Sequence, residues 1–126
     1  MNNSNALNAY QSNSVNTASK EKLLLMLLDG LVKFMKQGIS GIEEGSVKKS
    51  NDNFKKAQGI LLELKSTLDL NRGKELGKSL DLLYDYLYRR AVEANIKKDK
   101  AIAEEVLEFC IEIRETFNEA YKKLKP

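Results

Sequence analysis

The side chains best suited to chemistry in this sequence are carboxylates and one thiol. The chain has no histidine, so it lacks the commonest general base and the residue that catalytic triads and Glu-x-x-His di-iron motifs require. Cys110 is the single cysteine, which excludes an internal disulfide and a zinc site of cysteine and histidine. The carboxylates could bind a hard cation, but they show no EF-hand spacing and fit solvated helix faces. The sequence therefore predicts no enzyme activity, no metal and no cofactor.

A tyrosine cluster could stack on nucleotide bases, because Tyr84, Tyr86 and Tyr88 lie beside Arg89 and Arg90. A protein interface is the alternative, since tyrosine combines an apolar ring with a polar tip. The net charge of +3 comes from 21 basic and 18 acidic residues, a balance too even to indicate nucleic acid. We assign Tyr84 to a helix core, expect Tyr86 and Tyr88 to contact a protein, and expect no nucleic-acid partner.

Helices must position these side chains, because residues 20–125 are dense in Leu, Lys, Glu and Ala and the single proline is the last residue. Apolar residues recur every three or four positions in four segments, as in amphipathic helices. These predicted core stripes run from Leu24 to Ile42, from Val47 to Leu68, from Leu76 to Ala94 and from Ile102 to Leu124, and the last one includes Phe109.

The predicted helix boundaries follow from capping residues and turns. Ser19 is placed to cap the first helix, which ends near Glu44. Gly45 stops that helix, and Ser46 can cap the second. A turn is expected at 71–73, and another at 97–99 with Asp99 as the cap of the fourth helix.

The fold class predicted is all-α: an antiparallel up-down four-helix bundle over residues 19–126, preceded by a flexible arm at 1–18. The arm is rich in Asn and Ser but contains Leu7 and Tyr10, which solubility alone does not require. These two residues are either incidental in a disordered terminus or contacts for an apolar surface.

We expect a cytoplasmic protein that does not insert into membranes. The start of the chain lacks a basic region and an apolar core of the signal-peptide kind. The longest apolar run, at 23–28, is far shorter than a membrane span. A single cysteine also fits a reducing compartment.

That run is the most informative feature of the chain, because six consecutive helical residues at about 100° each cover every direction around the axis. Helical wheels place further apolar residues outside the core stripes of all four helices. Such residues either widen the core where neighbouring helices meet or line surface grooves that bind a partner's amphipathic helix. The candidate binding residues are Leu23, Leu25, Met26 and Val32 in the first helix, Ile60 and Leu62 in the second, Leu82, Tyr86 and Tyr88 in the third, Leu107 and Ile111 in the fourth, and Leu7 and Tyr10 in the arm.

Several short segments, in order along the chain, make it similar to a known family. They are Ala9-Tyr10-Gln11, Thr17-Ala18-Ser19, KLLLMLLDG at 22–30, Lys56-Ala57-Gln58, Thr67-Leu68-Asp69, Leu83-Tyr84-Asp85-Tyr86 with Arg89, Glu93-Ala94-Asn95, and Ile113-Arg114. With these segments the chain resembles the FliS family, the bacterial flagellar export chaperones for flagellin. It departs from the family pattern at Lys20, where members often have proline, at Leu28, where they usually have tyrosine, and at Phe117, which stands at a family tryptophan.

The resemblance implies a cytoplasmic four-helix bundle that binds the disordered C-terminal segment of flagellin and so prevents premature polymerisation. It implies that the loaded chaperone docks on a protein of the flagellar type III export gate. It also implies that the N-terminal arm occupies part of the client groove when no client is bound. A structural alternative stays open, in which a helical homo-oligomer or adaptor without a secreted client covers the same apolar residues. A weak homodimer is compatible with either hypothesis.

Overall fold

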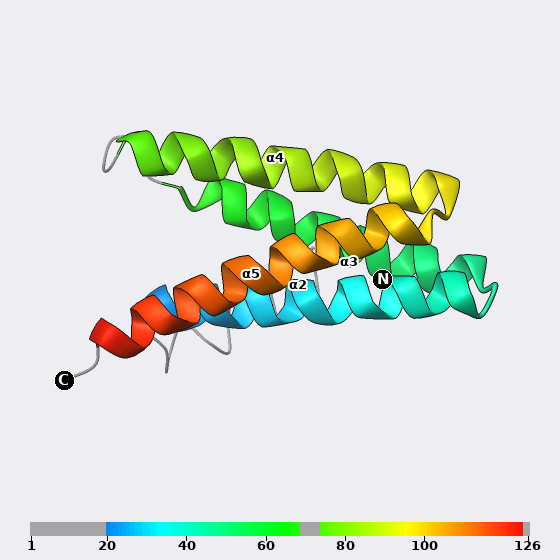
Figure 1. Ribbon diagram of the computed structural model, residues 1–126, viewed down its shortest axis with the longest axis horizontal. Helices are drawn as coiled ribbons and strands as arrows, with labels where there is room; N and C mark the ends of the chain where they lie inside the picture. The colour runs from blue at the N-terminus through cyan, green and yellow to red at the C-terminus, as the bar shows by residue number, and fades with distance from the viewer. Residues whose placement is uncertain (1–19, 69–73, 125–126) are drawn as a thin grey trace.

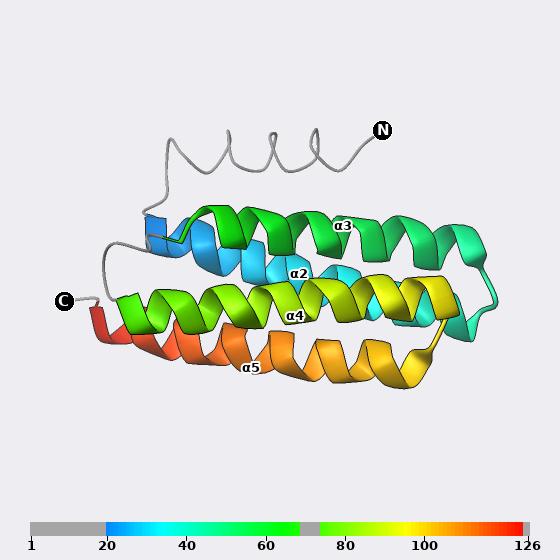
Figure 2. The same ribbon diagram turned by 90° about the horizontal axis from the view of Figure 1, so that it is seen from above.

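The computed structural model describes residues 20–68 and 74–124, and this part of the chain folds into four α-helices: α2 (Lys20–Glu43), α3 (Val47–Ser66), α4 (Lys74–Lys97) and α5 (Lys100–Leu124). Successive helices run in opposite directions (Figure 1). α2 packs against α3 and α5, and α4 packs against the same two helices (Figure 2). The predicted all-α four-helix bundle is confirmed. The predicted arm with Leu7 and Tyr10, the Ser19 cap and the turn at 71–73 lie outside the described residues.

Local hydrogen bonds explain where α2 ends and α3 begins. Gly45 adopts the left-handed conformation with φ 71°. The Ser46 N–H then donates to the Gly41 carbonyl at 2.8 Å, and the Gly45 N–H donates to the Ile42 carbonyl at 3.1 Å, which is a Schellman motif. The Ser46 hydroxyl accepts a hydrogen bond from the Lys49 N–H at 3.1 Å and caps α3. The prediction that Gly45 and Ser46 separate two helices is confirmed.

The turn between α4 and α5 also has a residue in the left-handed conformation, but that residue is not a glycine. Lys98 has φ 52°, and the Asp99 N–H donates to the Ala94 carbonyl at 3.0 Å. The Asp99 carboxylate accepts from the Ile102 N–H at 3.2 Å, so Asp99 caps α5 as predicted.

All four helices contribute to one core. Its largest fully buried side chains are Tyr84, Phe54, Leu27, Leu28, Leu31, Met35, Leu61, Leu64, Leu87, Val32, Val106 and Cys110. Burial raises the pKa of Cys110 to about 12, and burial followed by the nearby Cys110 raises that of Tyr84 to about 12. Both groups therefore stay neutral at physiological pH and act as packing residues.

Two predicted surface residues are instead part of this core, since Val32 and Ile60 are each 2% exposed. The expectation that they lie outside the core is wrong. A Cβ on Gly30 of α2 would lie 3.2 Å from the Ile60 Cδ1 atom, so Ile60 fills the space beside that glycine. Val32 belongs to the same core cluster as its neighbour Leu31. Both residues widen the core, which is the alternative that the sequence left open.

Three residues expected in the core are exposed. Val47 is the first residue of α3 and is 66% exposed. α4 and α5 lie close together at their connection but diverge toward the start of α4 in the view of Figure 1. Leu76, in the first turn of α4, is 65% exposed for this reason. Phe109 of α5 is 36% exposed, at the outer edge of the same pair of helices.

Candidate functional site

The seam between α2 and α5 brings together more of the predicted binding residues than any other part of the described surface. Leu25 and Met26 of α2 line an open hollow of ≈ 470 Å³ there, opposite Asn118 and Tyr121 of α5. Lys22, Asp29, Arg114, Glu115 and Lys122 complete its lining. A hollow with apolar walls and a charged rim is suited to a partner side chain of mixed character.

Arg114 spans this seam. Its guanidinium lies 3.9 Å from the Asp29 carboxylate of α2 and 3.5 Å from the Glu115 carboxylate on its own helix. These ion pairs are partly solvated, so they contribute little to stability. They hold the guanidinium at the middle of the seam, where it also lines a second hollow.

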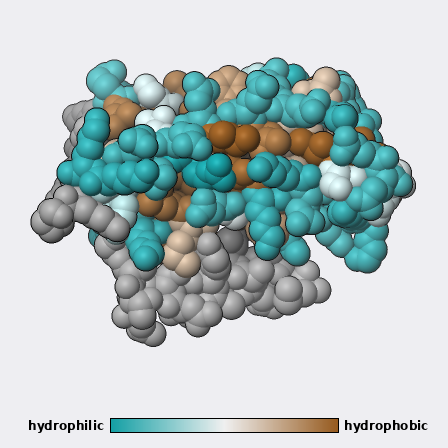
Figure 3. All heavy atoms as spheres, turned by 60° about the horizontal axis from the view of Figure 1, so that its bottom comes forward, coloured by the Kyte–Doolittle hydropathy of each residue, from teal (hydrophilic) through white to brown (hydrophobic). Residues whose placement is uncertain are grey.

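Leu107 and Ile111 lie on the same face of α5 as this arginine. Leu107, Ile111, Arg114, Asn118 and Tyr121 are spaced by four, three, four and three residues, which places them in one line along the helix. Both apolar residues are half-buried and pack against the core. Figure 3, turned so that the side of α2 and α5 comes forward, shows a band of hydrophobic surface between two hydrophilic margins. We call this seam the α2/α5 groove: Leu25, Met26 and Arg114 line its hollow, and helical spacing places Leu107 and Ile111 on the same face of α5 as Arg114.

The second hollow continues the α2/α5 groove toward the end of α2 and is basic. Its volume is ≈ 520 Å³. Its lining residues are Val32, Lys33, Lys36, Gln37, Ser40, Lys49 and Arg114. It contains no carboxylate among these residues, so its electrostatic potential favours an anionic partner.

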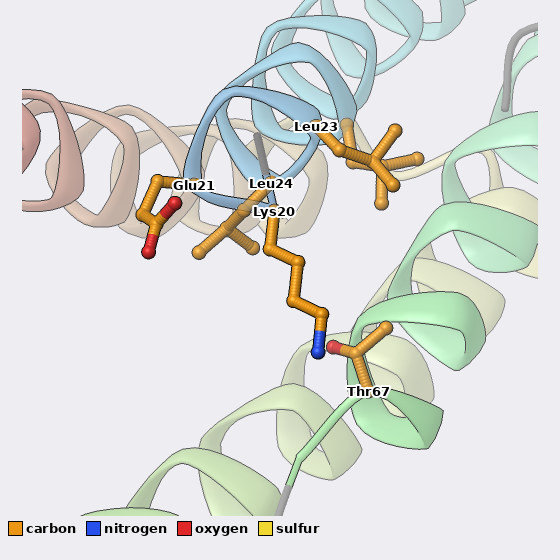
Figure 4. A pocket seen from close by; sticks show the side chains of 6 residues that line it. Lys20, Glu21, Leu23, Leu24 and Thr67 are labelled. Atoms are coloured by element: carbon orange, nitrogen blue, oxygen red, sulfur yellow. The ribbon is translucent and has the colours of Figure 1, made fainter. Parts of the chain in front are cut away.

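A separate hollow of ≈ 520 Å³ lies between the start of α2 and the end of α3, and it contains the predicted residue Leu23. Figure 4 shows Lys20 extending from the first turn of α2 toward Thr67 while Leu23 points toward α3. Leu24 and Leu27 form its apolar wall. This hollow faces a different seam from the α2/α5 groove, so Leu23 is not part of that groove.

An aromatic pair marks the seam between α4 and α5. The Tyr86 and Phe109 rings meet edge to face with centroids 6.3 Å apart. The Tyr86 hydroxyl donates to the Glu105 carboxylate at 2.8 Å, which raises the pKa of the phenol above its ordinary value. Leu82, one turn before Tyr86, is 71% exposed. The prediction that Leu82 and Tyr86 lie outside the core is correct.

The remaining two predicted residues belong to the seam between α3 and α4. Leu62 is 49% exposed and precedes Lys65, whose ammonium lies 3.3 Å from Asp81 and 3.5 Å from Asp85 of α4. Tyr88 is half-buried, one turn after Asp85. The candidate residues therefore divide among four seams rather than forming one site.

Comparison with known proteins assigns the family. A family model described as "Flagellar protein FliS" matches residues 3–124, nearly the whole chain. The chain belongs to the FliS family. The resemblance inferred from the sequence is thus confirmed.

Relatives from several bacteria carry the name flagellar secretion chaperone FliS. The Bacillus subtilis protein is 43% identical over 116 residues, covering 92% of this chain and 86% of the relative. The Salmonella typhimurium protein is 33% identical over 114 residues, covering 90% and 82%. The Vibrio cholerae protein is 30% identical over 118 residues, covering 90% and 87%. This FliS-family chain is therefore a member of a family of flagellar secretion chaperones.

The sequence missed the polar part of the α2/α5 groove in this FliS-family member. The sequence pattern indicated no binding role for Lys33, Lys36, Arg114, Asn118 or Tyr121, and Arg114 was named only within a segment shared with the family. The regular spacing from Leu107 to Tyr121 is the signal that could have identified the α5 wall. No comparable signal identifies the α2 wall, because Lys33 and Lys36 become part of the groove only when α5 packs beside them.

The described residues present neither an accessible thiol nor a group of metal ligands. The one thiol, Cys110, is fully buried, and its raised pKa leaves it protonated and unreactive at neutral pH. Within residues 20–68 and 74–124, no three carboxylates or thiols are grouped as metal ligands would be. The described helices also include none whose length and apolar character would let it cross a membrane.

Proposed function

We propose that this protein is a cytoplasmic export chaperone that binds the disordered C-terminal segment of flagellin in its apolar surface grooves. Binding would prevent premature polymerisation, and the loaded chaperone would deliver its client to the flagellar type III export gate. The observation that carries the proposal is the α2/α5 groove of a FliS-family bundle, where Leu25 and Met26 line a hollow beside α5 and helical spacing aligns Leu107 and Ile111 with Arg114.

Groove binding suits such a client for a physical reason. A segment that is disordered when free loses conformational entropy on binding, so it needs a large contact surface to bind tightly. An amphipathic helix laid into an apolar groove supplies that surface through side chains at i, i+3, i+4 and i+7. The α2/α5 groove is the main candidate. The hollow beside Leu23, the exposed Leu62, Leu82 and Tyr86, and the half-buried Tyr88 offer further contacts to a client that wraps around the bundle.

Calorimetry with a synthetic peptide of the flagellin C-terminal segment tests the proposal. We expect a 1:1 complex with a strongly negative heat-capacity change, because apolar surface is buried. Circular dichroism should show more helix in the mixture than in the two components separately. A peptide of the same composition in scrambled order serves as the control. Absence of a complex, or a complex without a heat-capacity change, would contradict groove binding.

The alternative role, a helical homo-oligomer, makes the opposite prediction in the same experiment. Self-association would cover the exposed residues Leu82 and Tyr86 and leave no stoichiometric site for flagellin. Sedimentation of the protein alone and with the peptide separates the two roles. A client-binding protein should sediment as a monomer or weak dimer, and the peptide should add its mass to that species.

We propose that the N-terminal arm, residues 1–18, competes with the client through Leu7 and Tyr10. A net bias of about 1 kcal/mol toward the covered state would lower the apparent affinity by roughly fivefold. Deletion of residues 1–16 should then speed association and tighten binding several-fold, and Tyr10→Ala should do so to a smaller degree. A deletion that weakens binding while the bundle stays folded would mean that the arm holds the client instead.

A further inference from the structure

The basic end of the α2/α5 groove carries positive charge that the described residues do not neutralise. Lys33 and Lys36, one turn apart on α2, form no ion pair within residues 20–68 and 74–124. The Lys33 ammonium lies 5.6 Å from the centre of the Phe34 ring, a weak cation–π contact.

The other two cations of this hollow are partly neutralised. Lys49 pairs with Glu44 at 2.6 Å, and Arg114 pairs at 3.9 Å with Asp29 and at 3.5 Å with Glu115. The acidic groups therefore lie beside Lys49 and Arg114, at the margins. The wall formed by Lys33 and Lys36 is left with a surplus of positive charge, and no carboxylate lines that hollow.

The α2/α5 groove consequently differs at its two ends. One end has the apolar side chains Leu25 and Met26, and the other has Lys33 and Lys36. Arg114 lines both hollows and so marks the boundary at which the two ends meet. From Met26 to Ser40 the groove follows α2 for about 21 Å, at roughly 1.5 Å per residue, which a partner helix of about four turns would match.

We propose that this groove holds a client helix whose apolar face contacts Leu25, Met26 and Ile111 and whose carboxylates lie over Lys33 and Lys36. Two acidic residues spaced by three or four positions on the client helix would face the two lysines, which are themselves three positions apart. The inference rests on the proposed function and adds to it the orientation and the charge pattern of the bound client helix. The acidic turn of the client would lie near the C-terminal half of α2, the half that precedes α3.

The charge distribution favours an acidic peptide over nucleic acid. A phosphate backbone would meet Asp29 and Glu115 as it continued along the groove, and these carboxylates would repel it. A helix with carboxylates at one end and apolar or basic residues at the other meets complementary groups along its whole length.

The test compares two double variants of the full-length chain. Lys33→Glu with Lys36→Glu reverses the charge of the proposed contact. Lys55→Glu with Lys78→Glu makes the same change in net charge at two exposed positions that line neither hollow of the groove. Affinity for the flagellin C-terminal peptide is measured by calorimetry at low and at high salt, and folding of each variant is checked by circular dichroism.

We expect the groove variant to bind about tenfold more weakly at low salt and to lose the salt dependence of the parent, while the control stays within about twofold. A variant Lys33→Gln with Lys36→Gln should show an intermediate loss. If the parent binds the peptide and the groove variant binds equally well with the same salt dependence, the charge contact is refuted and groove binding stands. If the parent does not bind the peptide, the proposed function fails and this inference with it.

Discussion

Gly41 of α2 lies directly against the backbone of Ser50 in α3. A Cβ atom on Gly41 would stand 2.5 Å from the Ser50 nitrogen and 2.8 Å from its Cα atom. Ser50 is fully buried, so the two helices approach closely at a position where α2 has no side chain. A similar relation holds at Gly38, whose Cβ would lie 2.5 Å from the Phe54 ring.

Gly41→Ala should therefore destabilise the bundle by about 1–3 kcal/mol, because the added methyl group meets backbone that cannot move aside. Gly30→Ala is the matched control. Its Cβ would meet only the tip of the Ile60 side chain, at 3.2 Å, and alanine favours the helix by about 1 kcal/mol. Urea unfolding measures both changes. Equal stability of the two variants would show that α2 and α3 can separate at no cost.

Lys98 occupies a left-handed conformation that costs a residue with a Cβ atom about 1–2 kcal/mol. Its ammonium also donates to the Asn95 side chain at 2.6 Å. Both Lys98→Gly and Lys98→Ala remove that hydrogen bond, but only glycine relieves the backbone. The glycine variant should be about 1 kcal/mol more stable than the alanine variant by thermal unfolding. An alanine variant as stable as the glycine variant would contradict the Schellman geometry.

Substitutions at Met26 and at Leu87 distinguish a groove residue from a core residue. Leu87 is fully buried, so Leu87→Ala should lower the free energy of unfolding by about 2–5 kcal/mol. Met26 lines the α2/α5 groove, so Met26→Glu should leave the melting temperature nearly unchanged and weaken peptide binding more than tenfold. Thermal unfolding and calorimetry measure the two effects. Comparable destabilisation by both substitutions would place Met26 in the core.

Alkaline pH should destabilise the bundle through Cys110 and Tyr84. Burial raises the pKa of Cys110 from 9.0 to about 12, and burial followed by the nearby Cys110 raises that of Tyr84 from 10.0 to about 12. A raised folded-state pKa means that the contribution of each group to stability is complete below its unfolded value and is lost as pH rises toward the folded value. Unfolding free energy should thus fall between about pH 9 and pH 12.

Lysine side chains also lose their charge at alkaline pH. A variant with Cys110→Ala and Tyr84→Phe separates the contribution of the thiol and the phenol from that of the lysines. Its free energy of unfolding starts lower but should decline less steeply with pH over the same range, as measured by urea titration at each pH. Parallel curves for the variant and the parent would show that neither group drives the alkaline transition.

The local signals in the sequence correctly identified the boundary between α2 and α3 and the boundary between α4 and α5. Ser46 and Asp99 cap the helices that follow them through hydrogen bonds to N–H groups three residues away. Such contacts involve neighbours in the chain, so residue type and spacing are enough to predict them. The core positions Leu61 and Leu87 were equally predictable, because each lies at the centre of an apolar stripe.

Residues at the edges of the stripes were less predictable. Ile60 and Leu62 both flank the stripe of α3, yet Ile60 is 2% exposed and Leu62 is 49% exposed. Gly30 of the neighbouring helix decides this difference, since it leaves room for Ile60. Leu76 is the opposite case: it lies on the predicted core stripe of α4 but is 65% exposed. The reason is that α5 diverges from α4 near the start of α4 (Figure 1).

The sequence by itself determined four amphipathic helices, the caps at Ser46 and Asp99, and an excess of apolar residues over what one core requires. Only the tertiary structure decided which of these residues share a surface: it brings Leu25 and Met26 beside Tyr121 and Arg114, and it places Leu82 and Tyr86 on another seam. The reason is physical. Helical periodicity is a property of neighbours in the chain, whereas the rotation of each helix and the choice of its partners depend on packing between segments far apart in the sequence.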